Sequence, residues 1–160
     1  MLGEWFTSTG RRDEIFLCTK FGGGIPEPPS WETASRPSYI RSAIKRSLFQ
    51  LKTTYIDLYW QHRVDPRVPI EIVVQTLGEF VDSGHIKYIG LSECSIDTLK
   101  RARAVPKYGE KVIAAQVEFS PFTLVMEKNG FAKAAEELGV GIVAYSPLGR
   151  GLMSGRYVSI

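Results

Sequence analysis

The chain has 160 residues, of which 44% are hydrophobic and 23% are charged, a composition typical of a globular domain. Its formal net charge is +3, and the 20 basic and 17 acidic residues are interspersed, which argues against a nucleic-acid partner. No apolar run approaches the length of about 18 residues that a membrane span needs, and no secretory signal is visible, so we expect a cytoplasmic protein. Cys18 and Cys94 lack metal-ligand spacing, so no zinc site is predicted and Cys18 is expected to be buried in the core.

Strand and helix patterns alternate along the chain after an initial helical segment. Short apolar runs predict strands over 14–20, 55–61, 86–91, 112–118 and 140–146. Apolar faces at helical spacing, with proline or serine at the starts and glycine at the ends, predict helices over 37–51, 69–83, 96–104 and 127–138. A loop rich in glycine and proline covers 21–36.

Repeated strand–helix–strand units force right-handed crossovers and therefore a parallel sheet in an α/β domain. The sheet is either an open doubly wound sheet or part of a (β/α)8 barrel. The chain is long enough for a single domain over residues 1–160, and a barrel there would be incomplete, because a complete one typically needs about 250 residues. In both architectures the active site lies at the carboxyl ends of the strands.

Titratable side chains follow two of the predicted strands. Lys20 is either a surface lysine at a strand end or a cation that lowers the pKa of a neighbouring acid. His62 is either a hydrogen-bonded rim residue or a group that orients a carbonyl or shuttles a proton. Asp57 lies inside a predicted buried strand and must be paired, and we expect Lys20 to be its partner.

Polar side chains also mark the ends of the three later strands. Ser92 and Gln116 predict a ligand with amide-like edges, and Tyr145 offers a flat face for stacking. Ser146 and Gly149 follow, and small residues with free N–H groups suit a phosphate. The sequence has neither a dinucleotide-binding G-x-G-x-x-G after the first strand nor a P-loop.

Taken together, these segments resemble the aldo-keto reductase superfamily over essentially the whole chain. The motifs that carry the resemblance are Leu-Cys-Thr-Lys-Phe (17–21), Tyr-Ile-Asp-Leu-Tyr-Trp-Gln-His-Arg-Val-Asp (55–65), Ile-Lys-Tyr-Ile-Gly-Leu-Ser-Glu (86–93), Ala-Gln-Val-Glu-Phe-Ser (115–120) and Val-Ala-Tyr-Ser-Pro-Leu-Gly-Arg-Gly (143–151). The second and third look most like the fungal and plant branch that includes pyridoxal-reductase-like enzymes.

The resemblance implies a partial (β/α)8 barrel, about strands three to seven of eight, and NADP(H)-dependent reduction of a small carbonyl substrate. It implies that Lys20 and His62 belong to the catalytic tetrad of the family. It also implies a set of cofactor-binding residues: Ser92 and Gln116 on the nicotinamide carboxamide, Tyr145 under the ring, and Ser146, Leu148, Gly149 and Arg150 along the pyrophosphate. Glu93 stands where the family often has asparagine.

The chain also departs from the family pattern. The catalytic tyrosine and aspartate of the family lie in a segment upstream of a Leu-Gly-Glu helix, and the chain begins at Met1-Leu2-Gly3-Glu4. We therefore expect a truncated domain that binds the cofactor weakly or not at all and that is catalytically inactive alone. Exposed sheet edges would allow such a domain to self-associate. A flavodoxin-like nucleotide-binding sheet is the remaining alternative, but it leaves the positions of Lys20 and His62 unexplained.

Overall fold

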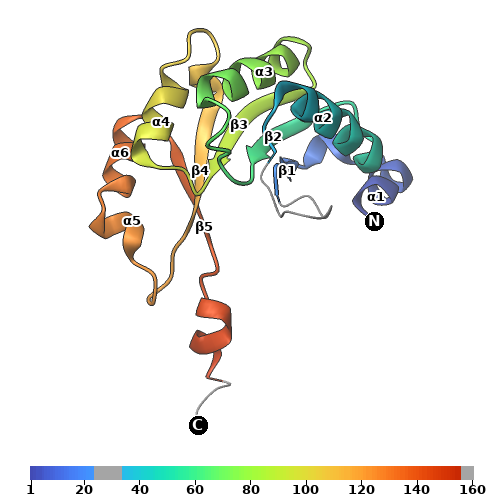
Figure 1. Ribbon diagram of the computed structural model, residues 1–160. Coiled ribbons are helices and arrows are strands. Elements are labelled where there is room, and N and C mark those ends of the chain that lie inside the picture. Colours follow the sequence, from blue (N-terminus) through green and yellow to red (C-terminus); the bar gives the residue numbers. More distant parts are fainter. Residues whose placement is uncertain (24–33, 156–160) are drawn as a thin grey trace, which may run out of the picture.

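The computed structural model describes residues 1–23 and 34–155 (Figure 1). The loop expected over 21–36 lies largely outside the described residues. The strands are β1 (Cys18–Phe21), β2 (Ile56–Gln61), β3 (Ile86–Ser92), β4 (Val112–Glu118) and β5 (Gly141–Tyr145). The α-helices are α1 (Leu2–Thr9), α2 (Pro37–Leu51), α3 (Ile70–Asp82), α4 (Ile96–Arg103), α5 (Val125–Lys128) and α6 (Phe131–Glu137). Short 3₁₀ helices are η1 (Arg12–Glu14), η2 (Gly109–Lys111) and η3 (Gly149–Ser154).

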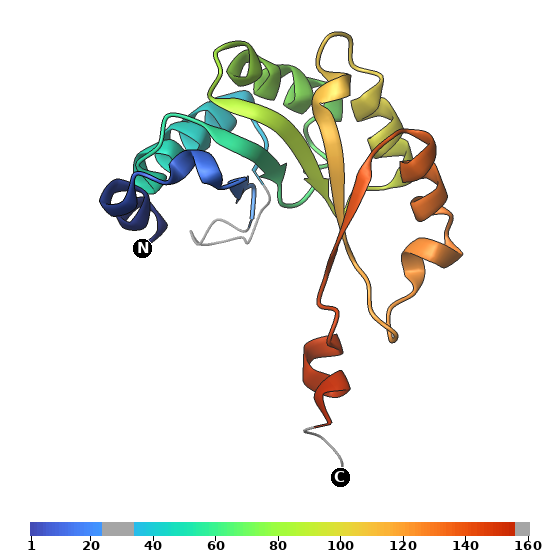
Figure 2. The same cartoon turned by 180° about the vertical axis from the view of Figure 1, so that it is seen from behind.

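The five strands form one parallel sheet in the order β1-β2-β3-β4-β5, so each strand pairs with its neighbour along the chain. Helices α2, α3, α4 and α6 lie along the outer side of the curved sheet (Figures 1 and 2). A doubly wound sheet reverses its strand order and carries helices on both faces. The sequential order with helices on one side confirms the partial (β/α)8 barrel and excludes the flavodoxin-like alternative.

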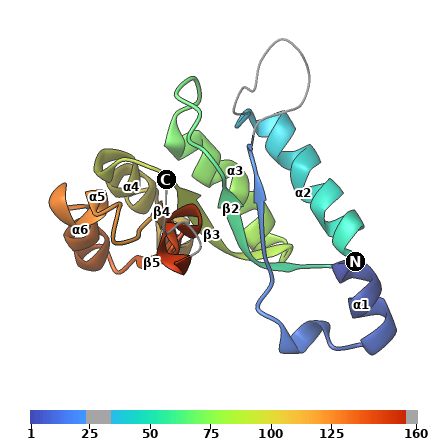
Figure 3. The same ribbon diagram turned by 90° about the horizontal axis from the view of Figure 1, so that it is seen from below.

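The main core lies between the sheet and its helices, which Figure 3 shows from below. Alternate strand residues such as Tyr59, Ile89 and Leu91 point outward and are fully buried under the helices. They pack with the apolar face that the helical spacing predicts, including Ile44 of α2 and Leu77 of α3. Burial of such a side chain contributes about 1.5–3 kcal/mol, so this layer is the main source of stability.

The inner face of the sheet holds a second, smaller cluster of buried side chains. Leu58 and Trp60 of β2 and Ala114 of β4 form it. Trp60 pairs in register with Gly90 of β3, and a Cβ atom at Gly90 would overlap the Trp60 ring. Glycine at position 90 is therefore what allows the indole to lie flat across the neighbouring strand.

The first strand is shorter than the predicted strand 14–20. Residues 12–14 form η1, and the Arg12 guanidinium donates to the carbonyl of Ile15 at 2.7 Å, which takes this carbonyl out of the sheet ladder. Ile15 and Phe16 are consequently exposed. The expected burial of Cys18 was wrong, since its thiol is free and exposed, whereas Cys94 is free and buried.

The single helix predicted over 127–138 is divided into α5 and α6. Gly130 adopts a left-handed conformation with φ 80°, and the Asn129 side chain accepts the N–H of Phe131 at 2.9 Å. Together they end one helix and begin the next. Elsewhere the predicted signals hold: Pro37 is the first residue of α2, and the Ser95 hydroxyl caps α4 by accepting from Thr98 N–H at 3.1 Å.

The outer strands β1 and β5 each pair on one side only within the described residues, so the expected self-association through sheet edges stays a prediction. No described helix is long and apolar enough to cross a membrane.

We predict that Gly90→Ala lowers the free energy of unfolding by about 1–3 kcal/mol, because the added methyl group must displace the Trp60 ring. Gly141→Ala is the matched control in β5, where the nearest atom to a new Cβ, the Ile113 carbonyl oxygen, is 3.6 Å away. Urea unfolding followed by tryptophan fluorescence measures both variants. Equal stabilities of the two variants would contradict the assignment of Trp60 to this packing.

Candidate active site

The two predicted catalytic side chains lie at the same end and on the same inner face of neighbouring strands. Lys20 of β1 pairs in register with Trp60 of β2, and its ammonium lies 6.0 Å from the centroid of the Trp60 ring. His62 is two residues beyond Trp60 and therefore projects from the same face. Its backbone N–H donates to the Phe21 carbonyl at 2.8 Å, which continues the β1–β2 pairing beyond the strand.

His62 is half-buried at this rim because the chain after β1 passes over it. A Cβ atom at Gly23 would lie 2.5 Å from Nδ1 of the imidazole, so only glycine leaves room for the ring. Burial lowers the pKa of His62, and the charges of Arg63 and Lys20 lower it further. His62 is therefore neutral at pH 7, and a neutral imidazole can donate one hydrogen bond to a carbonyl oxygen.

The predicted carboxamide-binding pair is also brought together. Ser92 at the end of β3 and Gln116 in β4 are register partners on adjacent strands. Ser92 is buried and Gln116 is half-buried. The Ser92 oxygen accepts a long hydrogen bond of 3.3 Å from Arg63, which leaves the hydroxyl proton available to a ligand. A hydroxyl donor beside a primary amide suits a ligand that has both an acceptor and a donor.

Tyr145 lies at the end of β5, the last strand of the sheet, where it pairs in register with Glu118. Burial raises the pKa of Tyr145, and a hydrogen bond with the Glu93 carboxylate raises it further. Glu93 itself has φ 53°, and its Oε1 atom accepts the Glu118 N–H at 2.9 Å. Glu93 thus ties the ends of β3, β4 and β5 together, a role that the sequence did not indicate.

The segment predicted to bind phosphate, residues 146–150, extends away from the strand ends that carry Ser92, Gln116 and Tyr145. It follows β5 and leads into η3, which projects beyond the sheet (Figure 1). Ser146, Gly149 and Arg150 all have positive φ values, of 56°, 54° and 55°. Gly149 packs against the Phe122 ring of the β4–α5 loop, whereas Leu148 and Arg150 are exposed. The segment therefore follows Tyr145 in the chain, but Leu148 and Arg150 do not contact Ser92 or Gln116 in the described structure.

Asp57 does not pair with Lys20, contrary to the expectation. It lies at the amino end of β2, where its carboxylate contacts Arg12 at 2.8 Å, Lys87 at 2.7 Å and the Leu17 N–H at 2.9 Å. The register places Lys20 opposite Trp60, three residues further along β2, so the two side chains cannot meet. Asp57 holds the beginning of the sheet together and is not part of the candidate site.

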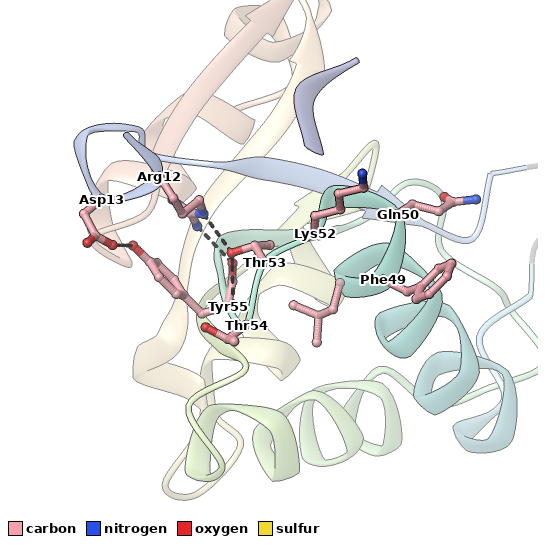
Figure 4. Close-up of a pocket in the computed structure, with 9 residues that line it drawn as sticks. Arg12, Asp13, Phe49, Gln50, Lys52, Thr53, Thr54 and Tyr55 are labelled. Carbon is pink, nitrogen blue, oxygen red and sulfur yellow. Dashed lines mark hydrogen bonds between the residues drawn. The ribbon is translucent and has the colours of Figure 1, made fainter. Parts of the chain in front are cut away.

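A depression of ≈ 820 Å³ lies near the same amino end, where α2 leads into β2. Figure 4 shows that Arg12 and Tyr55 line it and are already engaged in hydrogen bonds, Arg12 with Thr53 and Tyr55, and Tyr55 with Asp13. None of the predicted catalytic or cofactor-binding residues lines this depression. No group of three possible metal ligands occurs in the described part of the chain.

Arg63 is the residue at this rim that the sequence reasoning missed. It directly follows His62, and its Nη1 atom donates to the His62 carbonyl at 2.8 Å and to Ser92 Oγ at 3.3 Å. It thereby links the ends of β2 and β3. Its position inside the histidine motif was the signal that could have identified it.

We predict that Lys20→Gln raises the pKa of His62, because it removes one of the charges that disfavour the imidazolium. A ¹H–¹⁵N NMR titration of the imidazole measures this shift, with exposed His85 as an internal reference. Lys45→Gln removes an exposed charge from the opposite side of the sheet and is the matched control. An unchanged His62 titration in Lys20→Gln would show that the two groups do not share a site.

We predict that Asp57→Asn lowers the free energy of unfolding by about 2 kcal/mol at about pH 7, because Arg12 and Lys87 lose their common counter-charge. Burial raises the pKa of Asp57, but its bonds to Lys87, Leu17 and Arg12 outweigh burial and leave that pKa below 3.8. A carboxylate with a depressed pKa stabilises the fold above its unfolded pKa and loses this effect as the pH falls through its folded pKa.

The difference between the parent and Asp57→Asn should therefore shrink below about pH 4 in urea titrations. Asp97→Asn, which removes an exposed carboxylate of α4, is the control. A pH-independent difference would exclude the ionised carboxylate as its source.

The chain is similar to known proteins over most or all of its length. The sequence model described as "Aldo/keto reductase family" matches residues 1–160. "Aldo-keto reductase str7" of Strobilurus tenacellus is 47% identical over 161 residues, covering 99% of this chain and 45% of that protein. "Aldo-keto reductase yakc [NADP(+)]" of Schizosaccharomyces pombe is also 47% identical, covering 99% of this chain and 46% of that protein. "Probable aldo-keto reductase 1" of Glycine max is 44% identical over 147 residues, covering 92% and 41%.

A solved structure gives the same result for the fold. The crystal structure of the thermostable aldo-keto reductase Tm1743 with the inhibitor epalrestat superimposes with a TM-score of 0.80 at 26% identity. The match covers 94% of this chain and 50% of that chain. The chain thus spans about half the length of the relatives that it matches. On the family match over its whole length, the chain belongs to the aldo/keto reductase family.

Proposed function

We propose that this chain contributes part of the active site of an NADP(H)-dependent oxidoreductase that reduces small aldehydes or ketones to alcohols. The observation that carries the proposal is the shared position of Lys20, His62, Ser92, Gln116 and Tyr145. All of them lie at the carboxyl ends of strands that are paired in register, on the face of the sheet that no described helix covers. The relative named for NADP(+) supports the choice of cofactor.

The residues present fit a nicotinamide. Its carboxamide has one carbonyl oxygen and one amino group, which match the Ser92 hydroxyl and the side-chain oxygen of Gln116. The half-buried ring of Tyr145 at the next strand end offers a stacking surface. Ser146, Leu148, Gly149 and Arg150 would follow the pyrophosphate, since the positive φ values of Ser146, Gly149 and Arg150 suit a backbone that turns N–H groups toward an anion.

Bound NADPH supplies a hydride to the carbonyl carbon of the substrate. The side chains of this chain act on the oxygen, where negative charge develops. His62, held neutral by burial and by the neighbouring cations, donates a hydrogen bond that orients the carbonyl. Lys20 provides a positive charge at the same rim, which stabilises the charge on the oxygen and favours ionisation of a proton donor placed beside it.

A proton donor is the component that the described residues do not supply. The Tyr59 hydroxyl lies on the helix side beside Ser47, and burial raises its pKa to about 12. Tyr145 is engaged by Glu93. In residues 1–23 and 34–155 no tyrosine hydroxyl is hydrogen-bonded to Lys20 or His62. We therefore also propose that the chain of 160 residues alone is inactive, since loss of a general acid costs about 10²–10⁴ in rate.

We predict that the purified chain binds NADPH weakly and that Gln116→Ala weakens this binding about tenfold, the equivalent of one lost hydrogen bond to a carboxamide. Gln75→Ala, an exposed glutamine of α3, is the matched control. Enhancement of NADPH fluorescence measures the dissociation constants. Equal affinities of the two variants would contradict the placement of the nicotinamide beside Gln116.

In the same samples, NADPH oxidation with pyridoxal or aromatic aldehydes should be negligible. A turnover number near the typical enzyme value of about 10 s⁻¹ would contradict the proposed inactivity of the chain while supporting the proposed reaction.

A further inference from the structure

Arg63 is a half-buried cation at the candidate site that has no carboxylate partner in the part of the chain that the structure describes. Its contacts to the His62 carbonyl and to Ser92 Oγ both use Nη1. Within the described residues, its Nε and Nη2 atoms form no hydrogen bond to protein. A guanidinium has five N–H donors in a planar fork, so one edge of Arg63 remains available to a ligand.

The lack of a carboxylate partner distinguishes Arg63 from most of the other described arginines. Five described arginines are paired with carboxylates: Arg11 with Glu14, Arg12 with Asp57, Arg41 with Glu79, Arg67 with Asp65 and Arg101 with Glu71. Half-buried Arg103 is held by the backbone carbonyls of Gly109 and Val112. Arg36, Arg46 and Arg150 are exposed to water. A half-buried cation without a counter-charge is costly, and it is expected where a ligand provides that charge.

The surroundings of Arg63 are positive on one side. Arg63 and Lys20 both lower the pKa of His62, so both charges lie within electrostatic reach of the imidazole. The nearby acid Glu93 accepts the Glu118 N–H and contacts Tyr145, and it forms no ion pair with Arg63. Neither Lys20 nor Arg63 has a salt bridge to any described carboxylate, so the ends of β1 and β2 form a positive patch.

We propose that Arg63 binds an oxyanion, a carboxylate or a phosphate, carried by the carbonyl substrate. The inference rests on the proposed function, because it takes the substrate carbonyl to lie at His62, the preceding residue. The cofactor phosphates are a less suitable source of the anion, since the segment expected to hold them follows β5, whereas Arg63 lies beyond β2. Bidentate pairing with the free guanidinium edge would place the acidic group beside the reacting carbonyl.

The test compares the affinities of three aldehydes for the parent chain: benzaldehyde, 4-carboxybenzaldehyde and 4-formylphenyl phosphate. The chain is titrated with each by ¹H–¹⁵N NMR without cofactor, with the His62 imidazole signal as the local probe. We expect one or both acidic aldehydes to bind at least about tenfold more tightly than benzaldehyde, and the order of the two identifies the preferred oxyanion. Arg63→Gln should abolish this preference, and Lys45→Gln should retain it.

Equal affinity of all three aldehydes, or a preference that persists in Arg63→Gln, would overturn the proposal. If Arg63→Gln does not fold, Arg63→Lys serves instead, and it should weaken the preference because a lysine keeps the charge but loses the bidentate geometry. NADPH affinity measured in the same buffer separates the two proposals. An Arg63-dependent preference without NADPH binding would contradict the proposed function alone, and NADPH binding without the preference would contradict this inference alone.

Discussion

The parallel register of the sheet is the constraint on which the rest of the structure depends. Because Lys20 pairs with Trp60, Trp60 with Gly90 and Ser92 with Gln116, side chains that lie far apart in the sequence reach one rim on one face. A shift of one residue in any pairing would turn a strand over and move its polar end into the helix-covered core. The packing of Trp60 over Gly90 resists this shift, since no larger residue at position 90 would admit the indole.

The two ends of the strands have separate physical roles. At the amino end, the Asp57 carboxylate binds the Arg12 guanidinium, the Lys87 ammonium and the Leu17 N–H, so its charge is neutralised within the fold. At the carboxyl end, the half-buried guanidinium of Arg63 has no such partner among the described residues, whereas Lys20 is exposed. Paired charges contribute to stability, whereas unpaired half-buried charges are retained at a cost. The unpaired guanidinium of Arg63 therefore marks the carboxyl end of the sheet independently of any motif.

Sequence reasoning left the strand order open between a doubly wound sheet and a barrel, and only the family resemblance implied the barrel. It predicted the strands, the helices α2, α3 and α4, and the strand ends that carry Lys20, His62, Ser92, Gln116 and Tyr145. These succeed because each depends on local periodicity and on the direction of parallel strands. The pairing of Asp57 could not be predicted, since it depends on Arg12 returning through η1 from 45 residues away and on Lys87 from the next strand. The exposure of Cys18 depends on which face of β1 the register selects, and a strand of four residues carries too little pattern to decide it.

Arg63 illustrates a similar limit at the site itself. In the sequence it is one arginine among many, and most of the others in the described structure have carboxylate partners, so its residue type alone carries no information. Only the fold shows that its neighbours are His62, Ser92 and the end of β3, and that the nearby carboxylate of Glu93 is already engaged. The same rim thus combines a positive side at β1 and β2 with hydrogen-bonding groups at β3, β4 and β5. A substrate with an acidic group would neutralise the positive side of the rim, and a carboxamide would satisfy the hydrogen-bonding groups on the other side.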